Sequence, residues 1–430
     1  MRVLILGANG FIGSRILGRL LSEGHQVRAA VRDPARLRRR FPAIEAIPVD
    51  LNRFVKPDDW RVSLEGIEAV INCAGALQSS RTQRLAAIHR DAPVALYRAC
   101  LQAGCRRVIH LSAISADPAA GTEYARTKHA AEEDLKTLDL DWVILRPSLV
   151  YGEGSHGGTS LLRALAALPW ITPVPGRGNQ VFQPIYLDDL AETVALLLHE
   201  PRLSQLVLEP VGPERLDTAA IAASLRAWLG LKPARLVHTP MMLVRAAAML
   251  GDLIGAGPLR TTAVEQLLHG NAGDLAPYIT TTGIRPRRMS DALTARPSTV
   301  QDLWHARLFF LRPLLRLGLA LFWIWTGLAV LFLMPRAEGD ALLGAAGIPD
   351  LLRPSAWVAA GLLDLAMGAW LLLAHRIARV CLTMLAVTAG YLVILGTVAP
   401  ELWLDPLGGL AKTPIVMLAT LVLVAVGDER

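Results

Sequence analysis

The sequence is short of charge and of cysteine. Of its 430 residues, 19% are charged and 53% are hydrophobic, and the cysteines are Cys73, Cys100, Cys105 and Cys381. So apolar a chain is not intrinsically disordered, and so few cysteines do not build a disulfide framework. Because the cysteines form no CxxC pair and no zinc-like spacing, we predict no metal site.

Charge is scarcest in the last 125 residues, which hold nine basic and eight acidic residues, so most of the net +7 belongs to residues 1–305. Four apolar segments lie in this tail, at residues 317–334, 356–374, 380–399 and 413–427. A helix needs about 20 apolar residues to cross a bilayer, which the first three provide and the fourth nearly does. We predict an all-α, four-helix transmembrane domain over residues 306–430.

Residues 1–150 alternate short aliphatic runs with amphipathic stretches, the runs lying at 3–6, 26–31, 69–72, 107–111 and 142–145. Strands that alternate with helices predict an α/β domain with a Rossmann-type, doubly wound parallel sheet. The pattern loosens over residues 151–305, where we expect a small substrate-side subdomain. The amino-terminal apolar run stops at a glycine after five residues and is not typical of a secretion signal.

The first strand runs directly into a glycine loop and then a helix, the context in which a dinucleotide-binding motif is meaningful. Gly7 is expected to make the turn, Gly10 to let the backbone approach a pyrophosphate, and Gly13 to let helix and strand pack closely. The helix N-terminus supplies N–H groups to phosphates. The loop residues predicted to bind the cofactor are Gly7, Asn9, Gly10, Phe11, Ile12 and Gly13.

Arg32 follows the second strand and Asp33 follows Arg32. An arginine there can pair with the 2′-phosphate of NADP, whereas an acid binds the ribose hydroxyl of NAD. We predict NADP, with NAD left open by Asp33. The basic run at residues 36–40 has no interleaved aromatics, so it predicts a solvated helix face and no nucleic-acid partner.

Tyr124 and Lys128 are four residues apart, on one face of the helix that follows the fifth strand and Ser112. A neighbouring ammonium favours phenolate and lowers the pKa of a tyrosine. We therefore predict Tyr124 as general acid or base, with Lys128 lowering its pKa and bonding the nicotinamide ribose. Ser112 is the candidate third catalytic residue.

Together these motifs resemble the extended and atypical branches of the short-chain dehydrogenase/reductase superfamily, and most of all the branch of the accessory NAD(P)-binding subunit of respiratory complex I. The resemblance covers about residues 1–290 and includes Asp50-Leu51, Ala74-Gly75 and Pro147. It implies that Asp50 and Leu51 flank the adenine. It also implies that Ala74, Gly75 and Pro147 lie along the cofactor.

Two positions depart from the catalytic pattern of that superfamily. The second residue after the fifth strand, usually a catalytic hydroxyl, is Ala113. The helix position that is often Asn is His89, which could substitute for it but is more simply a surface histidine. These departures keep open a non-catalytic NADP(H)-binding module, for assembly or sensing in a membrane redox complex. A third possibility is an epimerase that uses the cofactor transiently.

The tail resembles the DoxX-like family of bacterial membrane proteins, on its helix count and on the segment 316–327 that opens its first helix. Asp364 lies within the second apolar segment, where an ionised carboxylate is costly unless paired. It is either a proton or quinone site or a contact facing the bundle interior. Both readings stay open from the sequence.

We expect a membrane-tethered NAD(P)H-dependent oxidoreductase that acts on a carbonyl or hydroxyl of a lipophilic substrate. Its other expected partners are the bilayer and a membrane redox protein. Basic residues favour one side of the predicted spans, which places the catalytic domain at the cytoplasmic face of the inner membrane with four crossings. The favoured side has Arg307, Arg312, Arg316, Arg376, Arg379 and Arg430, against Arg336, Arg353 and Lys412. Residues 300–315 could lie along the interface as a basic amphipathic helix.

Overall fold

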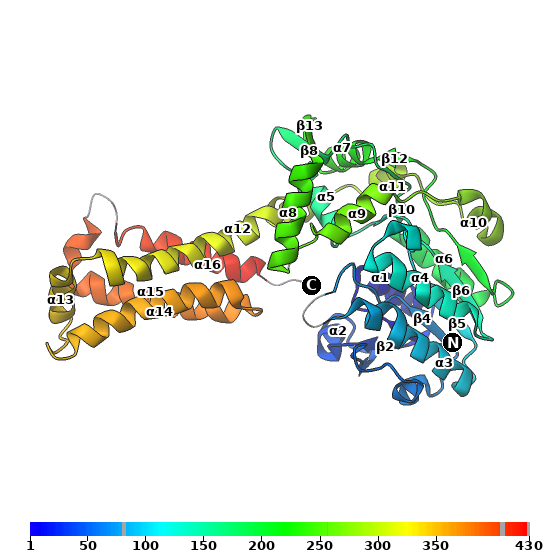
Figure 1. Cartoon of the computed structure of the whole chain (residues 1–430), viewed down its shortest axis with the longest axis horizontal. Coiled ribbons are helices and arrows are strands. Elements are labelled where there is room, and N and C mark those ends of the chain that lie inside the picture. The colour runs from blue at the N-terminus through cyan, green and yellow to red at the C-terminus, as the bar shows by residue number, and fades with distance from the viewer. Residues whose placement is uncertain (80–82, 256, 405–408, 428–430) are drawn as a thin grey trace. The chain divides into compact units, whose positions relative to one another are not determined.

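A computed structural model describes residues 1–79, 83–255, 257–404 and 409–427. The chain divides into two compact units, unit 1 (Met1–Ala306) and unit 2 (Arg307–Arg430). Figure 1 shows the sheet of unit 1 and the helices of unit 2. Arg430, counted in the charge asymmetry above, lies outside the described residues.

Unit 1 is built on a seven-stranded sheet in the order β11-β6-β5-β4-β1-β2-β3, and all of its strand pairs are parallel. The strands are β1 (Arg2–Leu6), β2 (Gln26–Val31), β3 (Glu45–Pro48), β4 (Ala69–Asn72), β5 (Arg107–Leu111), β6 (Asp141–Leu145) and β11 (Leu206–Leu208). This confirms the predicted doubly wound sheet. The strand order reverses between β1 and β4, the point at which such folds bind their ligands.

Alternate residues of the strands face opposite layers of helices, as the two-residue period of a strand requires. Val3 and Ile5 join the core formed with α1 (Phe11–Ser22), α2 (Pro34–Arg40) and α6 (Leu187–His199). Leu4 and Leu6 join the core formed with α3 (Ala92–Ala103) and α4 (Glu123–Lys136). The sheet is therefore covered on both faces, and its carboxyl edge is left for the site (Figure 1).

After β6 the chain builds a second layer of small sheets and helices and also returns to the main sheet through α6 and β11. Three residues are too short a run to stand out in the sequence, so β11 was not expected. The two-stranded sheets are β7 (Val150–Tyr151) with β10 (Ile185–Tyr186), β9 (Val181–Phe182) with β12 (Leu216–Asp217), and β8 (Ile171–Pro175) with β13 (Arg235–Thr239). The helices are α5 (Gly158–Ala166), α7 (Thr218–Trp228), α8 (Met241–Ile254), α9 (Thr261–His269), α10 (Leu275–Thr282) and α11 (Met289–Ala295).

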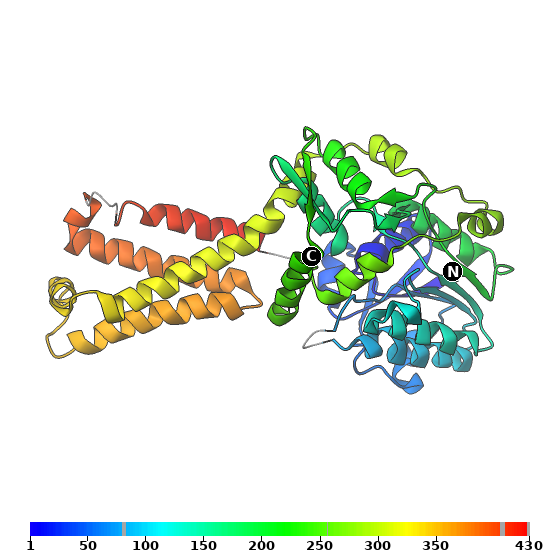
Figure 2. The same ribbon diagram turned by 45° about the horizontal axis from the view of Figure 1, so that its top comes forward.

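Unit 2 is helical. Its elements are α12 (Val300–Leu328), which begins in unit 1, the π-helical turn η5 (Ala329–Leu333), α13 (Arg336–Ala345), α14 (Arg353–Leu373), α15 (Ile377–Val398) and α16 (Thr413–Val426). Of the described helices, those at Val300–Leu333, Arg353–Leu373 and Ile377–Val398 are long and apolar enough to cross a membrane, whereas α16 is shorter. The long helices run alongside one another as a bundle (Figure 2).

Candidate functional site

The glycine loop joins β1 to α1 at the carboxyl edge of the sheet. Gly7 has a φ of +75°, and a Cβ on it would lie 2.9 Å from the backbone of Cys73 and Ala74. A Cβ on Gly13 would lie 2.3 Å from the Gly7 carbonyl oxygen. Side chains are therefore excluded at both positions, because the strand, the loop and the helix meet backbone to backbone.

The N-terminus of α1 opens beside this loop. Gly10 is the N-cap of α1, and its N–H donates to the Gly7 carbonyl at 2.9 Å. Having no side chain, Gly10 offers no cap to the first-turn N–H groups, which leaves these donors for an anion. Asn9, Phe11 and Ile12 lie half-buried at the same junction.

The end of β2 supplies the residues that were expected to select the cofactor. Arg32 is exposed there, and Gln83 accepts its two guanidinium N–H groups at 2.8 and 3.2 Å when its amide oxygen faces them. The Asp33 carboxylate accepts the Arg36 backbone N–H at 3.0 Å and caps α2. Asp33 thus serves as the N-cap of α2, and Arg32 lies beside the loop that follows β4.

Asp50 and Leu51 follow β3. The Asp50 carboxylate accepts the backbone and side-chain N–H groups of Asn52 at 3.0 and 3.1 Å. The Asn52 side-chain oxygen in turn accepts the Arg84 backbone N–H at 3.2 Å. Leu51 packs against the core beneath. The structure therefore places these residues at the same sheet edge as Arg32.

The end of β4 is fixed by a buried polar network. The Asn72 side chain accepts the Ala74 N–H at 3.0 Å and donates to Tyr97 at 2.9 Å, and the Tyr97 hydroxyl lies 2.8 Å from His110 Nδ1. Gly75 follows, exposed, and a Cβ on it would lie 3.8 Å from Lys128 Nζ. The backbone of residues 74–75 is thereby held between the glycine loop and α4.

Tyr124 and Lys128 share a face in the first turns of α4, as predicted. Lys128 is 4% exposed, its Nζ donates to the Leu111 carbonyl at 2.8 Å, and it lies 6.0 Å from the centroid of the Tyr124 ring. Burial lowers the pKa of Lys128 to about 8 and raises the pKa of Tyr124 to about 12. The expected lowering of the tyrosine pKa is therefore wrong for this structure, because loss of hydration disfavours the phenolate.

His89 belongs to the same cluster; the sequence left open whether it takes the place of the usual Asn or lies on the surface. It lies in the π-helical turn η3 (Ala87–Asp91) and is 1% exposed, so its assignment as a surface histidine is wrong. Its Nε2 accepts the Ala76 N–H at 3.2 Å, which leaves the proton on Nδ1, 2.9 Å from the Thr127 hydroxyl. The His89 ring stands edge-on to Tyr124 with centroids 5.3 Å apart. Burial and nearby Lys128 lower the pKa of His89.

Ser112 bonds an acidic residue of α4. Its hydroxyl donates to the buried Glu132 carboxylate, which also accepts the Arg146 guanidinium. The neighbouring Pro147 is buried, and its carbonyl accepts the Ile114 N–H at 3.2 Å. The structure thus brings Tyr124 and Lys128 together, and it bonds Ser112 to Glu132, whose negative charge also acts on Lys128.

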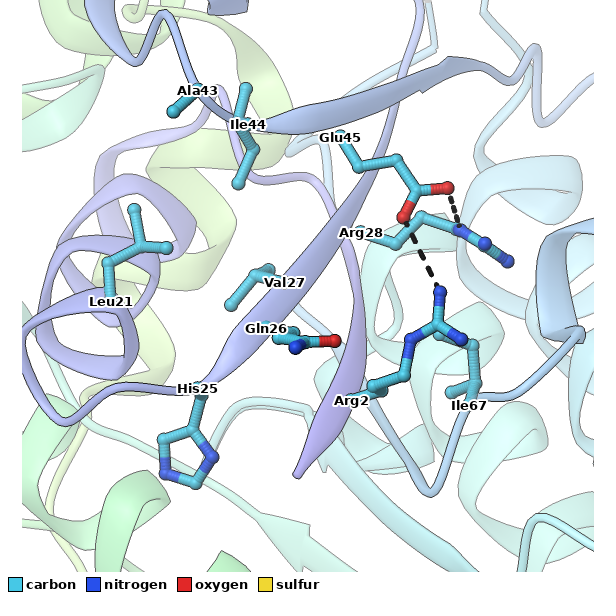
Figure 3. Close-up of a pocket in the computed structure, with 10 residues that line it drawn as sticks. All are labelled: Arg2, Leu21, His25, Gln26, Val27, Arg28, Ala43, Ile44, Glu45 and Ile67. Carbon is cyan, nitrogen blue, oxygen red and sulfur yellow. Dashed lines mark hydrogen bonds and ion pairs between the residues drawn. The ribbon is translucent and has the colours of Figure 1, made fainter.

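A cavity of about 350 Å³ lies at the other edge of the sheet, at the amino ends of β1, β2 and β3 (Figure 3). Glu45 there accepts the Arg28 Nε–H at 2.6 Å. His25 lines the cavity, and its Nε2 lies 3.3 Å from His199 Nε2 and 3.7 Å from the Glu23 carboxylate. Because the glycine loop follows the carboxyl end of β1, this cavity is not part of the candidate cofactor site.

Family comparisons agree with this geometry. Residues 7–169 match the family model described as NAD(P)H-binding, and residues 320–422 match the DoxX-like family. The chain joins an NAD(P)-binding, short-chain dehydrogenase/reductase-like domain to a DoxX-like domain. Both predicted resemblances are confirmed.

The NAD(P)-binding domain has two informative relatives. A ceramide reductase from Caulobacter vibrioides is 27% identical over 251 residues, which are 58% of this chain and 77% of that protein. The rat mitochondrial NADH dehydrogenase [ubiquinone] 1 alpha subcomplex subunit 9 is 27% identical over 218 residues. These cover 49% of this chain and 56% of that subunit, little more than half its length.

Solved structures show the same fold. The UDP-glucuronic acid 4-epimerase of Bacillus cereus, in complex with UDP-glucuronic acid and NAD, matches with a TM-score of 0.54 and 20% identity over 70% of this chain and all of that one. The UDP-glucose 4-epimerase of Thermus thermophilus, in complex with NAD, matches with a TM-score of 0.51 and 22% identity over 71% of this chain and 99% of that one. At this identity the likeness concerns the fold alone.

Proposed function

We propose that the chain is a membrane-tethered NAD(P)H-dependent reductase that acts on a carbonyl of a lipophilic substrate. The observation that carries the proposal is the Tyr124–Lys128–His89 cluster at the sheet edge that holds the glycine loop. A relative named for ceramide, which is a lipid, supports the substrate class.

The cofactor would supply the hydride, held by the glycine loop and the N–H groups of α1. The loop fits a pyrophosphate because Gly10, at the N-cap of α1, has no side chain to block the approach to the backbone N–H groups, and the Ala74 backbone lies beside Gly7. With a pKa of about 12, Tyr124 is protonated at neutral pH. In a reduction it would donate this proton to the carbonyl oxygen as the carbonyl carbon receives the hydride.

Lys128 and His89 position this donor. Lys128 uses one N–H on Leu111 and has two more to offer to ribose hydroxyls. His89 fixes the loop after β4 through Ala76. We assign Ser112 to holding Glu132 rather than to polarising the carbonyl, which leaves Tyr124 as the hydroxyl that contacts the substrate.

Replacing Tyr124 tests the chemistry. Tyr124→Phe should lower turnover by roughly 100-fold or more while leaving NADPH affinity nearly unchanged, because only the proton donor is removed. The assay follows NADPH oxidation by the full chain in lipid nanodiscs with a panel of long-chain ketones and aldehydes. A variant that keeps its rate would assign proton transfer elsewhere.

Replacing Arg32 tests the preference for NADP. Arg32→Ala should weaken NADPH binding by roughly 10- to 100-fold, the size of a lost charge-assisted hydrogen bond, and NADH binding much less. Calorimetry on both cofactors measures this, with Arg39→Ala on the neighbouring helix α2 as the matched control. Equal losses for the two cofactors would refute the assignment of Arg32 to the 2′-phosphate.

The second candidate is a non-catalytic NADP(H)-binding module of a membrane redox complex. Ala113 at the usual hydroxyl position and the turn of Ser112 toward Glu132 favour it, and so does the relationship to the rat subunit. NADPH binding without turnover on any member of the panel would support this module over the reductase.

The topology follows from the tail. We propose that the DoxX-like domain anchors the chain in the inner membrane with unit 1 in the cytoplasm, as the distribution of basic residues supports. The 14 residues of α16 form a helix about 21 Å long, so whether it crosses decides the side of the C-terminus. A C-terminal reporter that is active only after export should stay silent, and its activity would reduce the crossings to three.

A further inference from the structure

Helix α8 carries large apolar side chains on the surface of unit 1. The outward-facing ones, each between 54% and 84% exposed, are Met242, Leu243, Met249, Leu250, Leu253 and Ile254. The charged residues of the helix are Arg245 and Asp252. A helix that is apolar on nearly all sides is normally buried or in contact with a membrane. We therefore expect the outer face of α8 to contact an apolar surface that is not part of unit 1.

The inner face of α8 shows that this exposure is built into the fold. Ala248 is fully buried, and a Cβ on Gly251 would lie 2.1 Å from the Leu259 carbonyl oxygen. Asp252 accepts from Arg260 at 2.9 Å and from the Thr261 hydroxyl at 2.5 Å. Small residues and one paired carboxylate thus hold α8 against α9, beside which it lies in Figure 2, and the large apolar residues point outward.

The strands next to α8 extend the apolar surface. β13 leads into α8 through Pro240 and pairs with β8, and a Cβ on Gly176, just after β8, would lie 3.2 Å from Met241. Trp170, just before β8, is 84% exposed, and Leu236 of β13 is 41% exposed. Tryptophan is the residue that most favours the membrane–water interface.

The charge around this surface is positive. Residues 168–180 and 230–255 contain Arg177, Lys232, Arg235 and Arg245, and their acidic residue is Asp252. Arg260 pairs with Asp252, and Glu265 of α9 lies 3.9 Å from Arg245. A face of exposed leucine, methionine and tryptophan flanked by arginine and lysine matches the acyl boundary of a bilayer with anionic headgroups.

We propose that α8, together with Trp170 and Leu236, docks unit 1 on the bilayer by inserting these side chains at the headgroup–acyl boundary. The bilayer is the occupant because the same chain carries three helices long and apolar enough to cross a membrane, the first beginning at Val300. The apolar face of α8 then contacts the acyl chains, and the positive residues beside it contact the anionic headgroups of the same bilayer.

The docking surface connects to the catalytic helix. Arg260, at the start of α9, donates to the Ser79 carbonyl at 3.5 Å, and Gln266 of α9 donates to the Thr122 hydroxyl at 2.7 Å. Thr122 is the N-cap of α4, which carries Tyr124. If the proposed reductase function holds, on which this step rests, the α8–α9 pair places the entrance of the site at the membrane, and the substrate is a lipid that arrives from the bilayer.

Depth-dependent fluorescence quenching tests the docking surface. The full chain with Leu253→Cys, labelled with a small environment-sensitive fluorophore, is placed in nanodiscs of neutral and anionic phospholipid that contain a lipid with a nitroxide near its headgroup. The matched control is Val62→Cys, which is 73% exposed in the 3-10 turn η2 (Val62–Leu64). The unsubstituted chain, treated alike, gives the background of the four native cysteines.

Quenching at residue 253 should exceed that at residue 62 by at least threefold. With Leu250→Glu added, it should fall to the control level. Equal quenching at the two positions would overturn the proposal. So would a label at 253 that is shielded from water but not quenched by the lipid nitroxide, because a protein surface would then be the cover. Strong quenching by a chain that reduces no carbonyl would refute the reductase and support the docking surface.

Discussion

The two units differ in how many polar side chains they bury. In unit 1, many buried polar side chains bond other side chains, as Asn72 bonds Tyr97 and His110, and Glu132 bonds Arg146. In unit 2, the buried polar residues among those described are Asp364 and Thr420. Thr420 donates within its own helix to the Val416 carbonyl, and Tyr391 donates to Asp364 at 3.1 Å. Most of the buried polar side chains among the described residues therefore belong to unit 1, which holds the candidate chemistry.

Glycine residues also have different roles in the two units. Gly13 brings α1 against the backbone of the glycine loop, where nothing can move aside. Gly361 of α14 lets Leu331 of η5 approach, and Gly327 and Gly368 serve similar contacts between the same helices. Membrane helices pack closely through such small residues. One unit uses glycine to shape a binding loop, and the other uses it to bring helices together.

The largest effect is expected from Gly13→Ala. Its Cβ would lie 2.3 Å from the Gly7 oxygen, so the loop must shift, at a cost of about 3 kcal/mol, and NADPH binding should be lost. Gly18→Ala in the same helix is the control. Its Cβ meets no described atom within 4 Å, so it should stabilise the chain by roughly 0.5–1 kcal/mol. Thermal unfolding and calorimetry measure both, and unaltered NADPH binding by Gly13→Ala would disprove the close packing.

The sequence was sufficient wherever the signal is local. The spacing of Gly7, Gly10 and Gly13 predicted the loop, and the four-residue spacing of Tyr124 and Lys128 predicted their shared face. Both rest on geometry within a turn or two of one element. The apolar tail was equally legible, because membrane-spanning length is a property of one segment.

The sequence was insufficient where burial and long-range partners decide. His89 looks like any polar helix residue until its turn is packed against Tyr124. Ser112 donates to Glu132, which is 20 residues away, and no local sequence spacing predicts this hydrogen bond. Asp33, which seemed to compete for the ribose, is used as a helix cap. From composition alone, the apolar residues of α8 would be assigned to a hydrophobic core. Only the structure shows that their side chains are exposed on the surface of unit 1.

The buried imidazoles of unit 1 predict an acid-sensitive fold. Burial lowers the pKa of His89 and of His110 well below the ordinary value of 6.5. At these two positions the unfolded chain therefore binds more protons than the native one below that value. The two histidines cost no stability above about pH 6.5 and an increasing amount as the pH drops through it. The melting temperature of the full chain in mild detergent, measured from pH 7.5 to 5.5, tests this.

The control for this pH effect separates buried from exposed histidine. A His89→Gln, His110→Gln double variant should lose much of the pH dependence, even though it is less stable at pH 7.5. His156→Gln, at an exposed loop position, should retain the dependence of the parent chain. A double variant with the full dependence would place the titrating groups elsewhere.

The smallest effect is expected from Gly361→Ala in unit 2. Its Cβ would lie 2.5 Å from Leu331 Cγ and 3.2 Å from the Gly327 oxygen. The first contact is with a side chain that can turn aside, so the cost should be about 1–2 kcal/mol and smaller than that of Gly13→Ala. Gly390→Ala on α15, whose Cβ meets no described atom within 4 Å, is the control and should not destabilise the chain.

Detergent-based thermal unfolding compares these two variants, and NADPH calorimetry is run beside it. NADPH affinity should be the same in both, because every residue assigned to the cofactor lies in unit 1. If Gly361→Ala weakened NADPH binding, the helix contact at η5 would bear on the cofactor site. Packing in unit 2 would then be coupled to cofactor binding in unit 1, and the two units could not be treated as independent.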